Sequence, residues 1–213
     1  MHRTSHGWAL VMILLGLWLL SPSRAVEAGE PQERIQQMLT SLMAVFTDDT
    51  LKAPAQRQER YKRIAQVVSQ SFDVKEMARR SMGQYWHRIT PAQQGEFVQL
   101  FSDLLLQSLV KRIAYRATTN PGEYGSIPNA IQYLSESIDP DGDASVQTKM
   151  TYAQDPTPED IEYLLLRRDG TWWVYDVVAE GASMVTNYRT QFAQIMRQES
   201  FADLMQRLKT SQQ

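Results

Sequence analysis

The chain has 213 residues, a length that allows one domain, or at most two small ones, with a substantial hydrophobic core. It contains no cysteine, which excludes disulfide scaffolds, thiolate chemistry and a lipidated N-terminal cysteine. Its 22 basic and 24 acidic residues give a net charge of −2, and without a basic excess the composition argues against nucleic-acid binding.

The first 28 residues predict a secretory signal peptide. A weakly basic start is followed by an unbroken apolar run at residues 8–20, and Val26–Ala28 fits a small-x-small cleavage site, with Ser23–Ala25 as the alternative. The run is too short to span a bilayer, and no later stretch approaches the ~18 apolar residues of a transmembrane helix. We therefore expect one soluble domain over residues 29–213. Export without cysteine suits a bacterial periplasm.

The first half of the mature chain predicts four helices. Apolar residues recur at helical spacing in four segments: 31–46, 54–68, 73–83 and 91–116. Asp73, with Glu76 three residues later, predicts the N-cap of the third helix. Thr90 before Pro91 predicts the start of the fourth. This last helix is the longest and has the broadest apolar stripe, so we expect it to pack across a sheet.

A loop is predicted from Thr118 to Pro128, and the apolar period then changes from that of a helix to that of a strand. Four strands are predicted, at 130–138, 145–152, 163–168 and 171–178. Two helices follow, at 183–197 and 200–209. This order predicts an α+β fold in which a four-stranded antiparallel sheet is wrapped by helices.

The last two strands form a hairpin around the two-residue turn Asp169-Gly170, a strong hairpin signal. Pairing across this turn predicts Arg167–Trp172, Leu165–Val174 and Tyr163–Asp176 on one face, and Leu166–Trp173 and Leu164–Tyr175 on the other. Both faces are therefore largely apolar, an arrangement typical of a sheet that is covered on both sides.

Motifs for catalysis or metal binding are missing from the sequence. His87 is the one histidine of the mature chain, and its neighbours indicate an ordinary structural or surface position; with no cysteine, the usual zinc ligand sets are excluded. The acidic segment 139–143 fails the EF-hand pattern, because Gly142 comes two positions early and Met150 replaces the final glutamate. We therefore expect no catalytic residue, no metal and no cofactor.

Asp176 is the one carboxylate that the hairpin register places among apolar neighbours. A buried acid of this kind could act as a general base in a small α+β enzyme. The alternative is a structural carboxylate bonded to an arginine such as Arg189 or to backbone amides. The second reading is favoured, because no catalytic partner for Asp176 can be named.

Two groups of motifs resemble those of one family. The helical half contributes Phe72-Asp73, Met77–Arg80, Gly83–Trp86 and Thr90–Gln93 with Phe97 and Phe101. The other half contributes Asp169–Trp172, Val174–Val178, Glu180-Gly181 and Asn187–Phe192. Together they span about residues 35–208 and resemble the MlaC family, the periplasmic components of the Mla lipid-trafficking system, also called toluene-tolerance auxiliary proteins.

The resemblance implies an NTF2-like fold with a deep apolar pocket between sheet and helices. It implies a monomer that carries phospholipid between the inner and outer membranes and so maintains outer-membrane lipid asymmetry. The implied partners are an inner-membrane MCE-domain complex with its ABC transporter and an outer-membrane lipoprotein complex. A sheet apolar on both faces and ten methionines suit an adaptable apolar cavity.

The residues expected to bind lipid lie on the long helix and on one face of the sheet. They are Phe97, Phe101, Leu104, Leu105, Leu109, Val146, Met150, Tyr152, Tyr163, Leu165, Trp172 and Val174. Leu164, Leu166 and Trp173 are apolar where the family is often polar, which leaves open which face lines the pocket. Two alternatives remain: a carrier of hopanoids or other lipids within the same family, and a small NTF2-like enzyme that uses Asp176.

Overall fold

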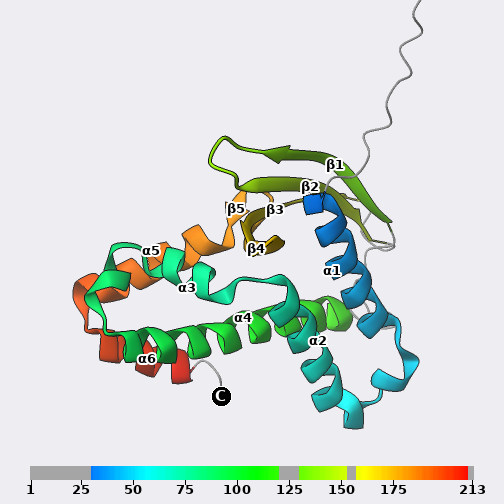
Figure 1. Ribbon diagram of the computed structural model, residues 1–213. Helices are drawn as coiled ribbons and strands as arrows, with labels where there is room; N and C mark the ends of the chain where they lie inside the picture. The colour runs from blue at the N-terminus through cyan, green and yellow to red at the C-terminus, as the bar shows by residue number, and fades with distance from the viewer. Residues whose placement is uncertain (1–29, 120–129, 153–156, 211–213) are drawn as a thin grey trace, which may run out of the picture.

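One block of helices precedes the strands and another follows them, as the sequence predicts (Figure 1). The computed structural model describes residues 30–119, 130–152 and 157–210 and, within the longest helix, side chains up to Ser108. The helices are α1 (Glu30–Thr47), α2 (Arg57–Ser71), α3 (Val74–Met82), α4 (Pro91–Thr119), α5 (Met184–Gln198) and α6 (Phe201–Thr210), with short 3₁₀ turns η1 (Asp49–Leu51), η2 (Pro54–Gln56) and η3 (Gly83–Arg88). The strands are β1 (Ala130–Ile138), β2 (Ala144–Thr151), β3 (Glu159–Arg168), β4 (Thr171–Ala179) and β5 (Ala182–Ser183).

Both predicted helix starts are confirmed by their hydrogen bonds. The Asp73 carboxylate accepts the backbone amide of Glu76 at 2.9 Å and caps α3. At the start of α4, the Thr90 hydroxyl accepts the Gln93 amide at 3.3 Å, and the Gln93 side chain accepts the Thr90 amide at 2.9 Å. This is a reciprocal capping box. The helix continues to Thr119, and the loop predicted beyond it lies outside the described residues.

The sheet is antiparallel and has five strands in the order β1-β2-β3-β4-β5, so the prediction of four strands is wrong by one. The additional strand, β5, has two residues and pairs with the end of β4 after a turn at Glu180 and Gly181, both at positive φ. A strand of two residues is too short to show an alternating pattern, which is why the sequence does not reveal it.

The predicted hairpin register is confirmed near the turn and wrong beyond it. Arg167 pairs with Trp172, Leu166 with Trp173 and Leu165 with Val174, as predicted. The register then shifts, so Leu164 pairs with Asp176 and Tyr163 with Val177. Tyr175 is the extra residue of this β-bulge. Consequently Val174, Tyr175 and Asp176 are all buried, which an unbroken alternation would not allow.

The hydrophobic core is divided between the two sides of the sheet. On one side α1 packs against the sheet and forms what we call the sheet cluster: Ile35, Met38, Leu39, Val67, Ala144, Val146, Met150, Ile161, Tyr163, Leu165, Trp172 and Val174. On the other, α3 to α6 form the helical cluster: Met77, Ala78, Met82, Tyr85, Trp86, Ile89, Phe97, Phe101, Leu105, Tyr175, Val185, Phe192, Leu204, Met205 and Leu208. The α+β architecture with a helix-covered sheet is thereby confirmed.

Phe72, at the junction of α2 and α3, packs against both clusters and against a third, smaller one between α1, η1, α2 and α4. It forms an isolated parallel bridge with Val174, and the amide of Asp73 donates to the Val174 carbonyl at 2.9 Å. These contacts fix the helices to the middle of β4. Over the described residues, none of the helices combines the length and apolarity needed to cross a membrane.

Candidate functional site

Seven of the twelve residues predicted to bind lipid share one face of the sheet. The burial of β2 alternates as predicted, with Val146, Thr148 and Met150 inside. This inner face is covered by α1, through Ile35 and its neighbours in the sheet cluster. The seven residues that the structure brings together here are Val146, Met150, Tyr152, Tyr163, Leu165, Trp172 and Val174.

Two hydroxyl side chains, of Thr148 and Tyr163, interrupt the otherwise apolar inner face of the sheet. Leu165 and Val174 pair at one end and are fully buried. Further along, Thr148 lies between Tyr133 of β1 and Ile161 of β3, and its hydroxyl donates to the Ile161 carbonyl at 3.1 Å. Tyr163 is almost fully buried, and this burial raises the pKa of its phenol. Burial therefore favours the neutral form of the Tyr163 phenol.

The far end of this face is only partly covered. Ile131, Tyr133 and Tyr152 are half-buried hydrophobic residues at the edge of the sheet cluster. The Tyr152 hydroxyl donates to the Glu159 carboxylate at 3.3 Å. Burial raises the pKa of Tyr133. This end, between the first half of β1 and the end of β2, is the least buried part of the described inner face, and we call it the open end.

The residues predicted on the long helix belong to the other cluster. Phe97 and Phe101 have no exposed surface and stack at 5.7 Å between ring centroids. Phe192 and Tyr188 of α5 pack edge-on against them, at 5.5 Å from Phe97 and 5.2 Å from Phe101. Leu104 and Leu105 lie in the same cluster, and the side chain of Leu109 falls outside the described residues. The structure thus does not bring the helix set and the sheet set together.

Several residues of the site are absent from the sequence-based prediction. Ile35, Met38 and Leu39 of α1 cover the inner face, and Tyr133 and Ile131 form its open end. The helical period of α1 is visible in the sequence, but which layer it covers is not. In β1 the bulge between Tyr133 and Ser135 interrupts the alternation, which weakens the signal for the inward residues.

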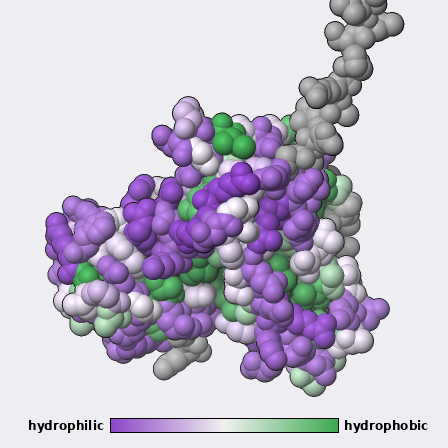
Figure 2. Space-filling model, in the orientation of Figure 1, coloured by the Kyte–Doolittle hydropathy of each residue, from purple (hydrophilic) through white to green (hydrophobic). Residues whose placement is uncertain are grey.

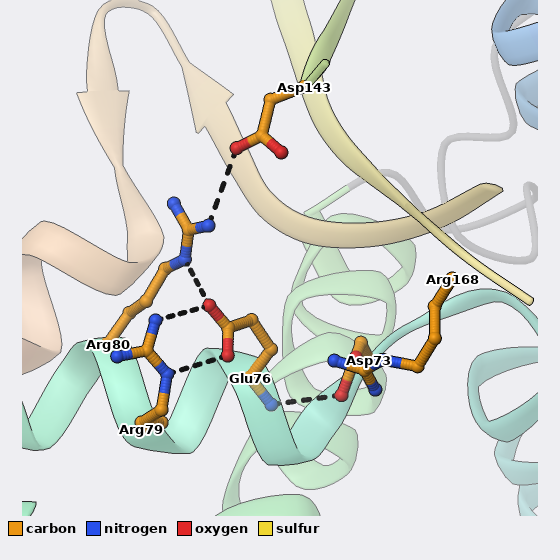
Figure 3. Close-up of polar contacts among 6 residues, drawn as sticks. All are labelled: Asp73, Glu76, Arg79, Arg80, Asp143 and Arg168. Carbon is orange, nitrogen blue, oxygen red and sulfur yellow. Dashed lines mark hydrogen bonds and ion pairs between the residues drawn. The ribbon is translucent and has the colours of Figure 1, made fainter. Parts of the chain in front are cut away.

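A polar network links the helices to the sheet on the opposite face (Figure 3). Glu76 of α3 is buried and accepts hydrogen bonds from Arg79 at 2.6 and 2.7 Å and from Arg80 at 2.7 Å. The hydrogen bonds from Arg79 and Arg80 outweigh burial and lower the pKa of Glu76 to about 2. Glu76 is therefore ionised throughout the physiological range and orients both guanidinium groups.

Arg80 carries this network into the sheet. Its guanidinium stacks 3.7 Å from the ring centroid of Tyr175, the bulged residue of β4. It also approaches the Asp143 carboxylate at 3.4 Å, as Figure 3 shows. Burial, followed by the charge of Asp143, raises the pKa of Tyr175 to about 12. A second link joins Arg168 of β3 to the buried carboxylate of Asp73. Both links join the helical layer to the sheet.

Asp176 is bonded as a structural carboxylate. It accepts the amides of Val177 at 2.8 Å and Val185 at 3.0 Å, and the hydroxyl of Ser183 at 2.5 Å. Ser183 in turn caps α5. The expectation of backbone-amide partners is confirmed, whereas Arg189 bonds elsewhere, to the Thr186 hydroxyl at 3.4 Å. With three donors on its two oxygens, the carboxylate orients the first turn of α5.

The remaining candidates are His87, the acidic segment 139–143 and one groove, and none has the arrangement of a catalytic or metal-binding site. His87 is exposed in η3. The Asp139 carboxylate accepts the amides of Asp141 and Asp143, at 3.0 and 2.9 Å, so segment 139–143 is a hydrogen-bonded turn. Within the described ranges, no three acidic or histidine side chains gather in a metal-binding arrangement. A groove of about 390 Å³ between α4 and α6 is lined by none of the predicted residues, and its lining includes Lys209 and Glu96, which form an ion pair at 2.9 Å.

Comparison with known proteins identifies a solved structure with a similar fold and a matching protein family. A solved structure of a phospholipid-binding protein from Ralstonia solanacearum, in complex with a phospholipid, superposes with a TM-score of 0.70 over 85% of this chain and 96% of that one. The two sequences are 22% identical, so the likeness shows a shared fold. The model of the MlaC protein family matches residues 36–210. The motifs that resemble this family fall within the matched range. This chain therefore belongs to the MlaC family.

Proposed function

We propose that this chain is a non-enzymatic phospholipid carrier of the periplasm. The observation that carries the proposal is its membership of the MlaC family over residues 36–210. The fold that it shares with a protein solved in complex with a phospholipid supports the same conclusion. In this proposal residues 1–28 are a signal peptide, and residues 29–213 form one monomeric lipid-binding domain. It moves lipid between an inner-membrane MCE-domain transporter and an outer-membrane lipoprotein complex and so maintains lipid asymmetry.

The lipid tails are proposed to lie against the inner face of the sheet. The seven sheet residues of the prediction form this surface, and its half-buried end at Ile131, Tyr133 and Tyr152 is the entrance. Phe97 and Phe101 are sealed within the helical cluster, so we assign them to the support of the helical layer. Tyr133, Thr148 and Tyr163 supply hydroxyls near the entrance, where the ester groups of a lipid would lie.

The enzyme alternative has less support. Asp176, the one carboxylate that could have served as a general base, holds its two oxygens against three donors at the start of α5. A general base must lie within hydrogen-bond reach of the substrate proton, whereas this carboxylate is buried and both of its oxygens are already fixed by donors of the chain. A structural role for Asp176 is compatible with carriage and leaves the inner face to the cargo.

If the chain carries phospholipid, the cost of exposing the lipid tails to water limits how the lipid can be released. Two acyl chains contain on the order of 30 CH₂ and CH₃ groups, and at ~0.8 kcal/mol each their exposure to water would cost about 20 kcal/mol. Even half of that cost would disfavour free lipid in buffer by a factor of about 10⁷ at equilibrium. Handover must therefore take place in contact with an acceptor that keeps the tails covered.

A labelled-lipid assay tests this proposal. Protein loaded with fluorescent phospholipid is separated from acceptor vesicles by a dialysis membrane, or is mixed with the MCE-domain protein of the same bacterium. We expect negligible loss through the membrane and rapid transfer on direct contact. Rapid loss through the membrane, without any gain from the MCE-domain protein, would refute the carrier mechanism. Loading with a hopanoid in place of phospholipid identifies the other branch of the family.

A further inference from the structure

Strand β1 forms the outer edge of the sheet, and no described strand pairs with its other side. The strand has nine residues and contains no lysine, arginine or proline, the residues that commonly protect a sheet edge from pairing. The bulge at Leu134 divides it into two straight parts. The second part, Ser135–Ile138, leads directly into the turn at Asp139–Asp143. Its unpaired backbone groups can accept one more strand.

This edge also exposes apolar side chains. Among the described residues, the two large hydrophobic side chains that are mostly exposed both lie on β1: Leu134 at 51% and Ile138 at 57%. Figure 2 shows a small hydrophobic patch within a hydrophilic surface at the top of the molecule, where Figure 1 places β1. An exposed apolar residue on an unpaired edge favours contact with another chain.

The charge around the edge indicates the chemistry of that chain. The described residues of the whole sheet and its turns, 130–152 and 157–183, include ten acidic and three basic residues, a net charge of −7. The described helical residues, 30–119 and 184–210, include 11 acidic and 17 basic residues, a net charge of +6. Within 130–143 there are four acidic residues and no basic one. Asp139 and Asp141 are exposed beside the edge.

We propose that the edge of β1 at Ser135–Ile138 binds an extended, basic segment of a partner protein as an additional antiparallel or parallel strand. The backbone of β1 supplies the ladder, Ile138 supplies an apolar contact, and Asp139 and Asp141 attract lysine or arginine. An anionic membrane surface would be repelled by the same charges. The site follows Tyr133 of the proposed lipid entrance on the same strand, and the inference does not rest on the proposed lipid carriage.

The test uses the full mature chain and synthetic peptides with blocked ends. One peptide of seven residues alternates lysine with valine; the second has glutamate for lysine, and the third has a central proline. Calorimetry measures affinity, and amide chemical shifts locate the binding site. We expect the lysine peptide to bind roughly tenfold more tightly than either control, with amide shifts confined to β1 and the turn that follows it. Its affinity should fall several-fold in high salt.

Two variants localise the effect. Asp141→Lys reverses an exposed charge beside the edge and is expected to lower the affinity for the lysine peptide about tenfold. Asp49→Lys makes the same change at η1, at the far end of α1, and should leave binding unchanged. Equal binding of the lysine and glutamate peptides, or shifts elsewhere, would overturn the proposal. So would a concentration-dependent dimer that protects the β1 amides, since the occupant would then be a second copy. Neither peptide affinity nor the amide shifts measures bound lipid, so failure of this proposal can be told apart from failure of the proposed lipid carriage.

Discussion

The helical cluster and the sheet cluster are both apolar, yet they are closed in different ways. The helical cluster is completed by aromatic rings from α4 and α5, whose centroids lie 5.2–5.9 Å apart, with no exposed surface at Phe97 or Phe101. The sheet cluster is closed at Val174 but half-buried at Tyr133 and Tyr152, and it contains hydroxyl groups. A close-packed interior has no room for a ligand, whereas a surface with one open end can admit one.

The largest effect is expected from truncation of the helical cluster. Phe101→Ala leaves a cavity among rings that cannot collapse, so the free energy of unfolding should fall by about 3–5 kcal/mol. Urea denaturation measures this loss. Phospholipid per folded molecule should be unchanged, because Phe101 is assigned to support. A variant that folds normally but is purified without lipid would place Phe101 in the pocket and remove the distinction between the clusters.

Asp176→Asn should have the next largest effect. An amide offers one acceptor oxygen in place of the two that receive Val177, Ser183 and Val185, so we expect a loss of about 2–3 kcal/mol. Chemical denaturation provides the measurement, and bound phospholipid per folded molecule serves as the control readout. A stable variant that had lost its activity toward phospholipid would favour the enzyme alternative.

Glu76→Gln tests the polar network between α3 and the sheet. Since Arg79 and Arg80 are themselves 45% and 32% exposed, the loss at neutral pH should be about 1–2 kcal/mol. The ordinary pKa of this carboxyl is 4.5 and its pKa in the folded chain is about 2. Its stabilisation is therefore complete above pH 4.5 and is lost as the pH falls toward 2. The free energy of unfolding, measured from pH 2 to 7, should therefore depend less on pH in Glu76→Gln than in the unaltered chain. Identical pH profiles for the two proteins would contradict the role given to Glu76.

The smallest effect on stability is expected at the open end of the sheet cluster. Ile131→Glu changes a half-buried residue and should cost less than about 1 kcal/mol. Because the new carboxylate would face the proposed entrance, phospholipid per folded molecule should fall well below that of the unaltered chain. Gln132→Glu introduces the same carboxylate at the neighbouring position, on the exposed face of β1, and is the matched control. Equal lipid content in the two variants would move the entrance elsewhere.

The sequence predicts local structure well where the cause is local. The caps at Asp73 and Thr90 and the hairpin turn at Asp169-Gly170 depend on residues a few positions apart, and all three are confirmed. The bulge in β4 places Tyr175 against Arg80, almost a hundred positions away in the sequence, and no local pattern reveals such a contact.

The candidate site shows the same limit. Alternation in β2 identifies its inward residues correctly, whereas periodicity alone cannot tell which layer a helix covers. Phe97 and Phe101 were therefore expected beside the sheet residues, and the structure places them with α5 instead. Phe72, which contacts all three clusters, precedes a helix cap and gives no sequence signal of that role.

Denaturing mass spectrometry of the protein purified from a bacterial periplasm tests the central claim most directly. A carrier whose cargo cannot escape into water should retain it through purification, so we predict about one phospholipid per chain. The signal peptide should be absent from the same spectrum, with the chain beginning near residue 29. Protein recovered folded and free of phospholipid would contradict the assignment of this chain as a phospholipid carrier.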